Sequence, residues 1–220
     1  MSDWELFLQE VSWFLEPGES VVVGEAQPWS RRSAEDLPEL SALLGSTTLT
    51  PIFVGDTAYE LLAWGPSDDR RGWLCRPPEE VANGGSFPQA HKSFWKLCGG
   101  IVERFGEPDT WWCNQDQVLT AQATRLRISE VVADYVWLWE GEGLKLPINP
   151  DEYYAVAEEA NGNLTLAHRD NGRLLLFAPD HAFEDVTPLD GCPPYSLLTI
   201  DDVPDLATWI EACAEAWRLQ

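Results

Sequence analysis

The stretch Tyr153–Ala178, YYAVAEEANGNLTLAHRDNGRLLLFA, carries the clearest structural signal in the chain. Two short alternating segments and a third apolar run are separated by Asn161-Gly162-Asn163 and Asn171-Gly172. Asn-Gly sequences favour the tight turns that join antiparallel strands. The stretch therefore predicts a three-stranded meander, whose strands are Tyr153–Ala157, Leu164–His168 and Arg173–Ala178.

The remaining periodic segments predict helices and further strands. Apolar residues recur at helical spacing over Asp3–Glu16, Ser129–Glu140 and about Val203–Leu219, and more weakly over Ser33–Leu44 and at the start of Phe87–Phe105. Short apolar runs with Gly- and Asp-rich breaks predict antiparallel strands. Those strands are Ser20–Val23, Leu49–Val54, Ala58–Trp64 and Gly72–Arg76. The fold class expected is α+β, with a mixed or antiparallel sheet, flanking helices and a closing C-terminal helix.

A loop near residue 80 suggests how the chain is divided. Pro77-Pro78 and Asn83-Gly84-Gly85-Ser86 interrupt the pattern there. We expect residues 1–80 to form an N-terminal elaboration packed on an α+β core at residues 81–220.

Charge is the strongest global feature. The 220 residues contain 37 Asp and Glu against 14 Lys and Arg, a net charge of −23. Nucleic acids and anionic membranes bind through cationic contacts, so both are disfavoured as partners. A basic protein is attracted by the same field. Acidity also keeps proteins soluble, which is the plainer interpretation.

The acids concentrate in the C-terminal half. Nine lie between Leu174 and Trp217, where Lys and Arg are absent, and eight lie between Ile128 and Asn163, where Lys145 is the one cation. These one-signed stretches predict a contact surface for a basic protein. Its predicted residues are Glu140, Glu142, Asp151, Glu152, Glu158, Glu159, Asp180, Glu184, Asp185 and Asp190.

The location expected is cytoplasmic. No apolar run approaches the roughly 20 residues of a transmembrane helix, and the start, Met1-Ser2-Asp3-Trp4-Glu5, lacks the basic and apolar regions of a secretory signal. Five cysteines without CxxC spacing favour free, buried thiols over a disulfide framework or a zinc site. The sequence leaves the oligomeric state open.

No residue pattern indicates catalysis, so we expect no enzyme activity, cofactor or metal. Phosphate-binding glycine loops and the Gly-x-Ser-x-Gly elbow are missing from the sequence. Adjacent carboxylates are expected by chance in so acidic a chain. The alternative is a metal-dependent hydrolase that uses His168 and His181, with oxygen ligands from Asp180, Glu184 or Asp185.

Eight of the twelve tryptophans fall into two groups. Those on predicted apolar faces, Trp4, Trp95, Trp139, Trp209 and Trp217, are expected in the core. Trp111, Trp112 and Trp137 do not fit such faces, and any of them that is exposed would mark a contact site.

Five motifs in order resemble the SUKH superfamily, which groups bacterial immunity proteins with fungal cell-wall regulators. The resemblance covers roughly residues 80–220, and some 80 residues precede it that do not align. A further departure is the segment after the glycine turn, which is Asp-rich in the family and here reads Asn163-Leu164-Thr165-Leu166. The motifs are Phe94–Gly100, Leu146-Pro147-Ile148, Ala160–Asn163, Leu174–His181 and the closing segment Leu206–Trp217.

The resemblance implies a non-catalytic sheet flanked by helices and a role as an immunity protein against a secreted toxin, often a nuclease. A nuclease presents a cationic groove, which an acidic protein can occlude. A regulatory or scaffold protein that binds another partner remains a further alternative.

Overall fold

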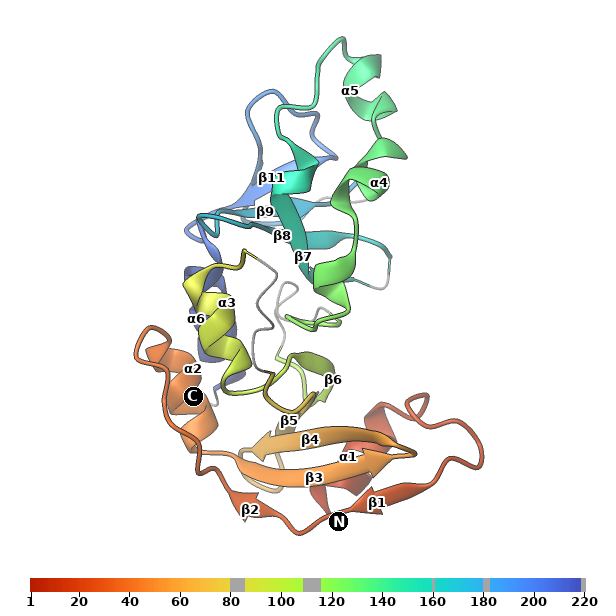
Figure 1. Ribbon diagram of the computed structural model, residues 1–220, viewed down its shortest axis with the longest axis vertical. Helices are drawn as coiled ribbons and strands as arrows, with labels where there is room; N and C mark the ends of the chain where they lie inside the picture. Colours follow the sequence, from red (N-terminus) through yellow and green to blue (C-terminus); the bar gives the residue numbers. More distant parts are fainter. Residues whose placement is uncertain (80–85, 109–115, 160, 180–182, 219–220) are drawn as a thin grey trace. The chain divides into compact units, whose positions relative to one another are not determined.

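The computed structural model describes residues 1–79, 86–108, 116–159, 161–179 and 183–218 (Figure 1). The chain forms two compact units. Unit 1 comprises Met1–Val81, Ser93–Asn114 and Ile210–Gln220, and unit 2 comprises Ala82–Lys92 and Gln115–Trp209. The boundary expected near residue 80 lies where the chain first passes between units, and two later segments return to unit 1.

Unit 1 contains an antiparallel sheet in the order β1-β3-β4-β5-β6, with β2 also pairing with β3. The predicted hairpins are confirmed: β3 and β4 join at Gly55-Asp56, and β4 pairs with β5. The strands are β1 (Val21–Val23), β2 (Gln27–Pro28), β3 (Thr48–Val54), β4 (Thr57–Trp64), β5 (Arg71–Cys75) and β6 (Ile101–Phe105).

Helix α1 (Asp3–Glu10) begins with a capping box between Ser2 and Glu5, and it packs on the unit 1 core. The predicted helix over Asp3–Glu16 is too long, because the chain leaves helical geometry at Val11. A turn instead brings the Phe14 ring against Phe7, with centroids 5.4 Å apart. The apolar contact is therefore kept without a helix.

Helix α2 (Pro38–Gly45) starts five residues later than predicted, with Pro38 in its first turn. Leu37 provides no side-chain cap. The Glu211 carboxylate instead accepts hydrogen bonds from the backbone N–H groups of Glu39 (2.7 Å) and Leu40 (3.1 Å). Glu211 thus neutralises the positive end of a helix.

Unit 2 contains an antiparallel sheet in the order β10-β11-β9-β8-β7. The predicted meander is confirmed as β7–β8–β9, and the sequence did not indicate β10 or β11. The strands are β7 (Tyr153–Glu158), β8 (Leu164–His168), β9 (Leu174–Phe177), β10 (Val186–Pro188) and β11 (Leu197–Ile200).

Two short helices pack on the core of this sheet: α4 (Ile128–Ala133) lies beside β7, and α5 (Trp137–Gly141) follows beyond it (Figure 1). The single helix predicted over Ser129–Glu140 is divided by a turn at residues 134–136. Two 3-10 turns flank the pair, η2 (Ala123–Arg125) and η3 (Pro150–Glu152).

The two remaining helices, α3 (Gln89–Trp95) and α6 (Leu206–Trp217), each begin in unit 2 and end in unit 1. Helix α6 is the predicted closing helix. Its first turn is capped by Asp205, whose carboxylate accepts from the Thr208 N–H at 2.9 Å. With two antiparallel sheets and these helices, the fold is α+β, as expected. No helix among the described residues is both long enough and apolar enough to cross a membrane.

Candidate interaction surface

Most of the predicted contact acids lie in water. Seven are exposed, while Glu158 and Glu159 are half-buried and Asp180 lies outside the described residues. Six of the exposed acids make no ion pair with any residue that the structure describes. These six are Glu140, Glu142, Asp151, Glu184, Asp185 and Asp190.

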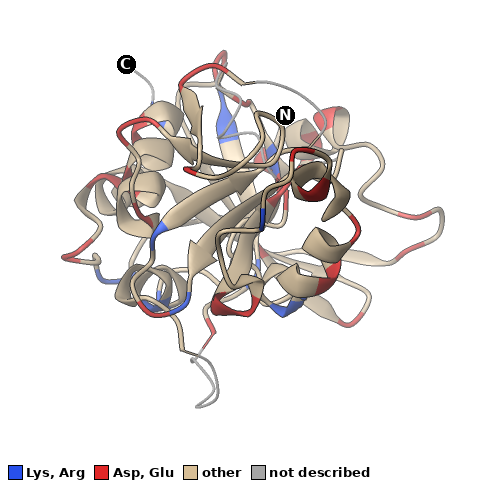
Figure 2. Cartoon of the chain, turned by 90° about the horizontal axis from the view of Figure 1, so that it is seen from above, with Lys and Arg blue, Asp and Glu red and all other residues tan. Residues whose placement is uncertain are grey.

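The topology does not gather the whole set on one element. Asp151 and Glu152 precede β7, at one edge of the unit 2 sheet, whereas Glu184 and Asp185 precede β10, at the opposite edge. Figure 2 likewise shows the acidic segments in red on many separate loops, strand ends and helices. The predicted surface is therefore not one continuous patch formed by all ten acids.

Three of the predicted acids already have contacts within unit 2. Glu152 lies 3.5 Å from His168 Nε2, and Glu159 accepts from the Asn163 side-chain amide at 2.9 Å. Burial, together with the negative charge of nearby Asp116, raises the pKa of Glu158. These carboxylates are the least free to meet a partner.

The structure brings the end of α5, which carries Glu140 and Glu142, close to the turn that carries Asp190. Trp139, which directly precedes Glu140, is fully buried, and its Nε1 donates to Cys192 Sγ at 3.4 Å. The turn at Asp190-Gly191-Cys192 also lies against the segment after α5, because a Cβ at Gly191 would be 3.8 Å from Pro147. Figure 1 shows the two loops side by side at this end of unit 2.

Helix α5 ends in a motif that fixes the chain after Glu142. The Gly143 N–H bonds to the Glu140 carbonyl at 3.0 Å, and the Leu144 N–H bonds to the Trp139 carbonyl at 2.8 Å. Gly143 adopts φ +69°, as the Schellman motif requires. The motif sets where Leu144 leaves the helix.

A cluster of apolar side chains is exposed on this segment. Trp137 is 60% exposed, Val136 40% and Leu144 37%, although the neighbouring Trp139 is completely buried. Isolated exposed apolar residues are common, but three within nine positions are typical of a contact site. We define the α5 surface as the exposed residues Asp134, Val136, Trp137, Glu140, Glu142 and Leu144.

Helical geometry places carboxylates on both sides of Trp137. The turn between α4 and α5 keeps helical backbone angles at Asp134 and Val136. Asp134, in this turn, precedes Trp137 by three positions, and Glu140, in α5, follows it by three, the spacing at which residues with helical backbone angles are neighbours. Asp134 was not among the predicted contact residues, although its spacing from Trp137 and Glu140 is readable in the sequence.

The metal site considered from the sequence is only partly described, since His181 and Asp180 lie outside the described residues. The His168 Nδ1 accepts from the Asp170 N–H at 3.2 Å, and its ring packs edge-on against Tyr153. Among the described residues, no three His, Cys, Asp or Glu side chains lie together in a way that could hold a metal ion.

Sequence reasoning missed a buried polar pair in unit 2. His91 is fully buried, with Nδ1 2.8 Å from the Tyr154 hydroxyl oxygen. Burial lowers the pKa of His91 to about 3, although a backbone hydrogen bond to Leu119 opposes this shift. Burial also raises the pKa of Tyr154. The imidazole is therefore neutral in the folded protein at neutral pH.

The tryptophans expected in the core are all buried, which confirms that prediction: Trp4, Trp95, Trp139, Trp209 and Trp217. Trp111 and Trp112 lie outside the described residues. Cys75 and Cys98 are buried free thiols, as expected, whereas Cys192 and Cys213 are half-buried and Cys113 is not described.

Comparison with known proteins does not identify the chain: no family model, curated protein or solved structure matches it. The α5 surface is accordingly interpreted from its own geometry and charge.

Proposed function

We propose that this protein is a non-catalytic binding protein whose partner is a basic protein. The observation that carries the proposal is the set of six exposed acids of unit 2 that make no ion pair with a described residue. An exposed carboxylate without an internal partner keeps its full charge for long-range attraction. Three of these acids, Glu140, Glu142 and Asp190, lie at one end of unit 2.

The kind of partner is proposed from the SUKH resemblance: a basic, nuclease-type toxin that an immunity protein neutralises by occlusion. Physical chemistry supports this choice, because a groove that binds phosphates also attracts an array of carboxylates. The cytoplasmic location expected from the sequence belongs to the same proposal.

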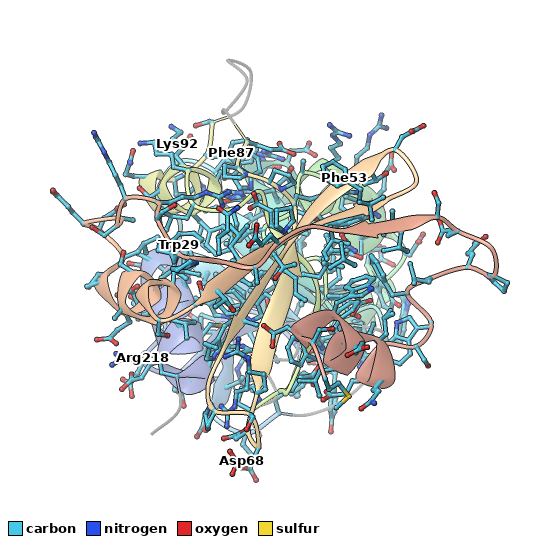
Figure 3. The ribbon with its side chains drawn as sticks, turned by 90° about the horizontal axis from the view of Figure 1, so that it is seen from below. Trp29, Phe53, Asp68, Phe87, Lys92 and Arg218 are labelled. Carbon is cyan, nitrogen blue, oxygen red and sulfur yellow. The ribbon has the colours of Figure 1, made fainter. Side chains whose placement is uncertain are left out.

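The test compares two variants with the same change in charge. Glu140→Gln, Glu142→Gln and Asp190→Asn remove three carboxylates at the α5 end of unit 2. Glu25→Gln, Asp56→Asn and Asp68→Asn remove three exposed carboxylates of unit 1, where Asp68 points outward from the β4–β5 turn (Figure 3). Both variants carry −23 + 3 = −20 charges.

Wild type and both variants are immobilised, used to isolate partners from the source cell, and then titrated with the purified partner at increasing NaCl. We expect a basic partner, an affinity that falls steeply with salt, and a loss of about tenfold or more in the unit 2 variant only. Equal losses in the two variants would show that net charge, not this surface, attracts the partner. A partner that binds equally well at low and high salt would contradict the proposal.

A further inference from the structure

Trp137 is a large apolar side chain placed where water reaches most of it. The residue is 60% exposed, and no ring or cation of a described residue stacks on its indole. Asp134, three positions before it in the turn, and Glu140, three positions after it in α5, are exposed and make no ion pair with a described residue. An aromatic face between two carboxylates attracts a cation that also has apolar surface.

Unit 1 holds an occupied example of the same chemistry. The Arg31 guanidinium lies over the Trp29 ring, 5.3 Å from its centroid, and donates to Glu60 Oε2 at 2.7 Å. Trp29 is labelled in Figure 3. At the α5 surface the tryptophan and the carboxylates are present, but Lys145 is the sole Lys or Arg between Ile128 and Asn163. No described Lys or Arg pairs with these carboxylates or lies over this ring, so an arginine that binds here comes from another molecule.

We infer that Trp137, Asp134 and Glu140 form a docking site for an arginine side chain of the basic partner. The guanidinium stacks on the indole while its N–H groups face the two carboxylates. Val136 and Leu144, exposed on the same surface, receive an apolar side chain next to that arginine. The inference rests on the proposed function and names the point where the partner is held.

Arginine fits this site better than lysine for two reasons. The guanidinium is planar and weakly hydrated, so it stacks on an indole with little loss of solvation. It also presents several donors in one plane, which can serve two carboxylates at once. A lysine ammonium would gain mainly the charge attraction.

The test uses three short fluorescein-labelled peptides in which leucine alternates with arginine, with lysine, or with citrulline, the neutral isostere of arginine. Binding is followed by fluorescence anisotropy at low salt. The variants are Trp137→Ala, the double variant Asp134→Asn with Glu140→Gln, and the control Trp13→Ala. Trp13 is 69% exposed and belongs to unit 1, so it controls for loss of an exposed indole elsewhere.

We expect either change at the α5 surface to weaken binding of the arginine peptide about tenfold relative to wild type. Trp13→Ala should bind this peptide with an affinity within about twofold of the wild-type value. Trp137→Ala should lower the affinity for the lysine peptide about twofold. The citrulline peptide should bind wild type more weakly than the other two peptides do. Urea unfolding checks that each variant is folded. We expect all of them to fold, because the substituted residues are exposed.

The outcomes separate this inference from the proposed function. If wild type binds the arginine peptide and Trp137→Ala binds it equally well, the docking site is wrong while the acidic-surface proposal stands. Equal losses in Trp137→Ala and Trp13→Ala would also overturn the site. If wild type binds the arginine and lysine peptides no better than the citrulline peptide, both ideas fail.

Discussion

At the scale of single residues, His91 should make the stability of unit 2 depend on pH. Its pKa is lowered to about 3 in the folded protein, while an unfolded histidine titrates near 6.5. Between these values the unfolded chain binds one more proton, so stability is fully present above pH 6.5 and falls as the pH drops. We expect a loss of about 2 kcal/mol between pH 7 and pH 5.

The measurement is urea unfolding across this pH range for wild type and His91→Gln. The variant should be less stable at neutral pH, because it disturbs the contact with Tyr154, but its stability should change less on acidification. The raised pKa of Glu158 acts in the opposite direction and is common to both proteins, so it cancels in the difference. Parallel pH profiles would show that His91 is not the titrating group.

The burial of a residue could be predicted only where the spacing of nearby apolar residues indicates it. The five core tryptophans lie at helical spacing with other apolar residues, and their burial was predicted. His91 sits in Pro88-Gln89-Ala90-His91-Lys92, which has no such period. Its burial depends on Tyr154, a residue distant in sequence, and no local signal indicates that contact.

At the scale of elements, the Schellman motif that ends α5 should depend on one glycine. Gly141 and Gly143 both have open space where a Cβ would be, but only Gly143 has positive φ, +69°. Alanine is disfavoured in that region by about 1 kcal/mol, whereas alanine in a helix is better than glycine. Gly143→Ala should lower the unfolding free energy of unit 2 by about 1 kcal/mol, and Gly141→Ala should raise it by up to about 1 kcal/mol.

Denaturant unfolding of the two single variants checks this pair. Because neither new methyl group meets a neighbour, steric clash cannot account for a difference between them. If both substitutions stabilise the protein, the helix does not need the left-handed residue. A change in the exposure of Leu144 would accompany the loss, since its N–H bond to Trp139 belongs to the motif.

Element prediction succeeded where spacing and turn chemistry agree, as in β7–β8–β9 with its Asn-Gly turns. It failed where packing sets the boundary. The turn after α1 keeps Phe14 on the core, and the turn at residues 134–136 divides a segment whose apolar period is continuous. Strands β10 and β11 were missed because β10 has only three residues, one of them Pro188, and β11 has four.

At the scale of the whole molecule, composition predicted that acids would be exposed, but not which of them would meet. Glu140 and Asp190 are separated by fifty residues, and the contact of Trp139 with Cys192 brings the segments that carry them together. Asp151 and Asp185, in equally acidic stretches, lie at opposite edges of a sheet. The order of the strands in the sheet determines which acids lie close together, and the charge pattern of the sequence does not reveal that order.

The net charge of −23 should make the fold more stable in salt. Like charges repel more in the compact state than in the expanded one, and raising salt from 0.01 M to 0.15 M shortens the screening length from about 30 Å to about 8 Å. Salt also weakens ion pairs such as Arg70–Asp3, but both partners there are mostly buried and are screened less. We therefore expect the melting temperature to rise, by about 2–4 °C for each kcal/mol of repulsion relieved.

Thermal unfolding in NaCl and in KCl provides the measurement, and equal effects of the two salts identify screening rather than binding of a particular cation. Either of the variants with a net charge of −20 should gain less from salt than wild type, because less repulsion remains to be screened. A melting temperature that falls on adding salt would mean that ion pairs outweigh repulsion. In that case ion pairs such as Arg70–Asp3 and Arg31–Glu60, and not repulsion among the acids, would set how stability depends on salt.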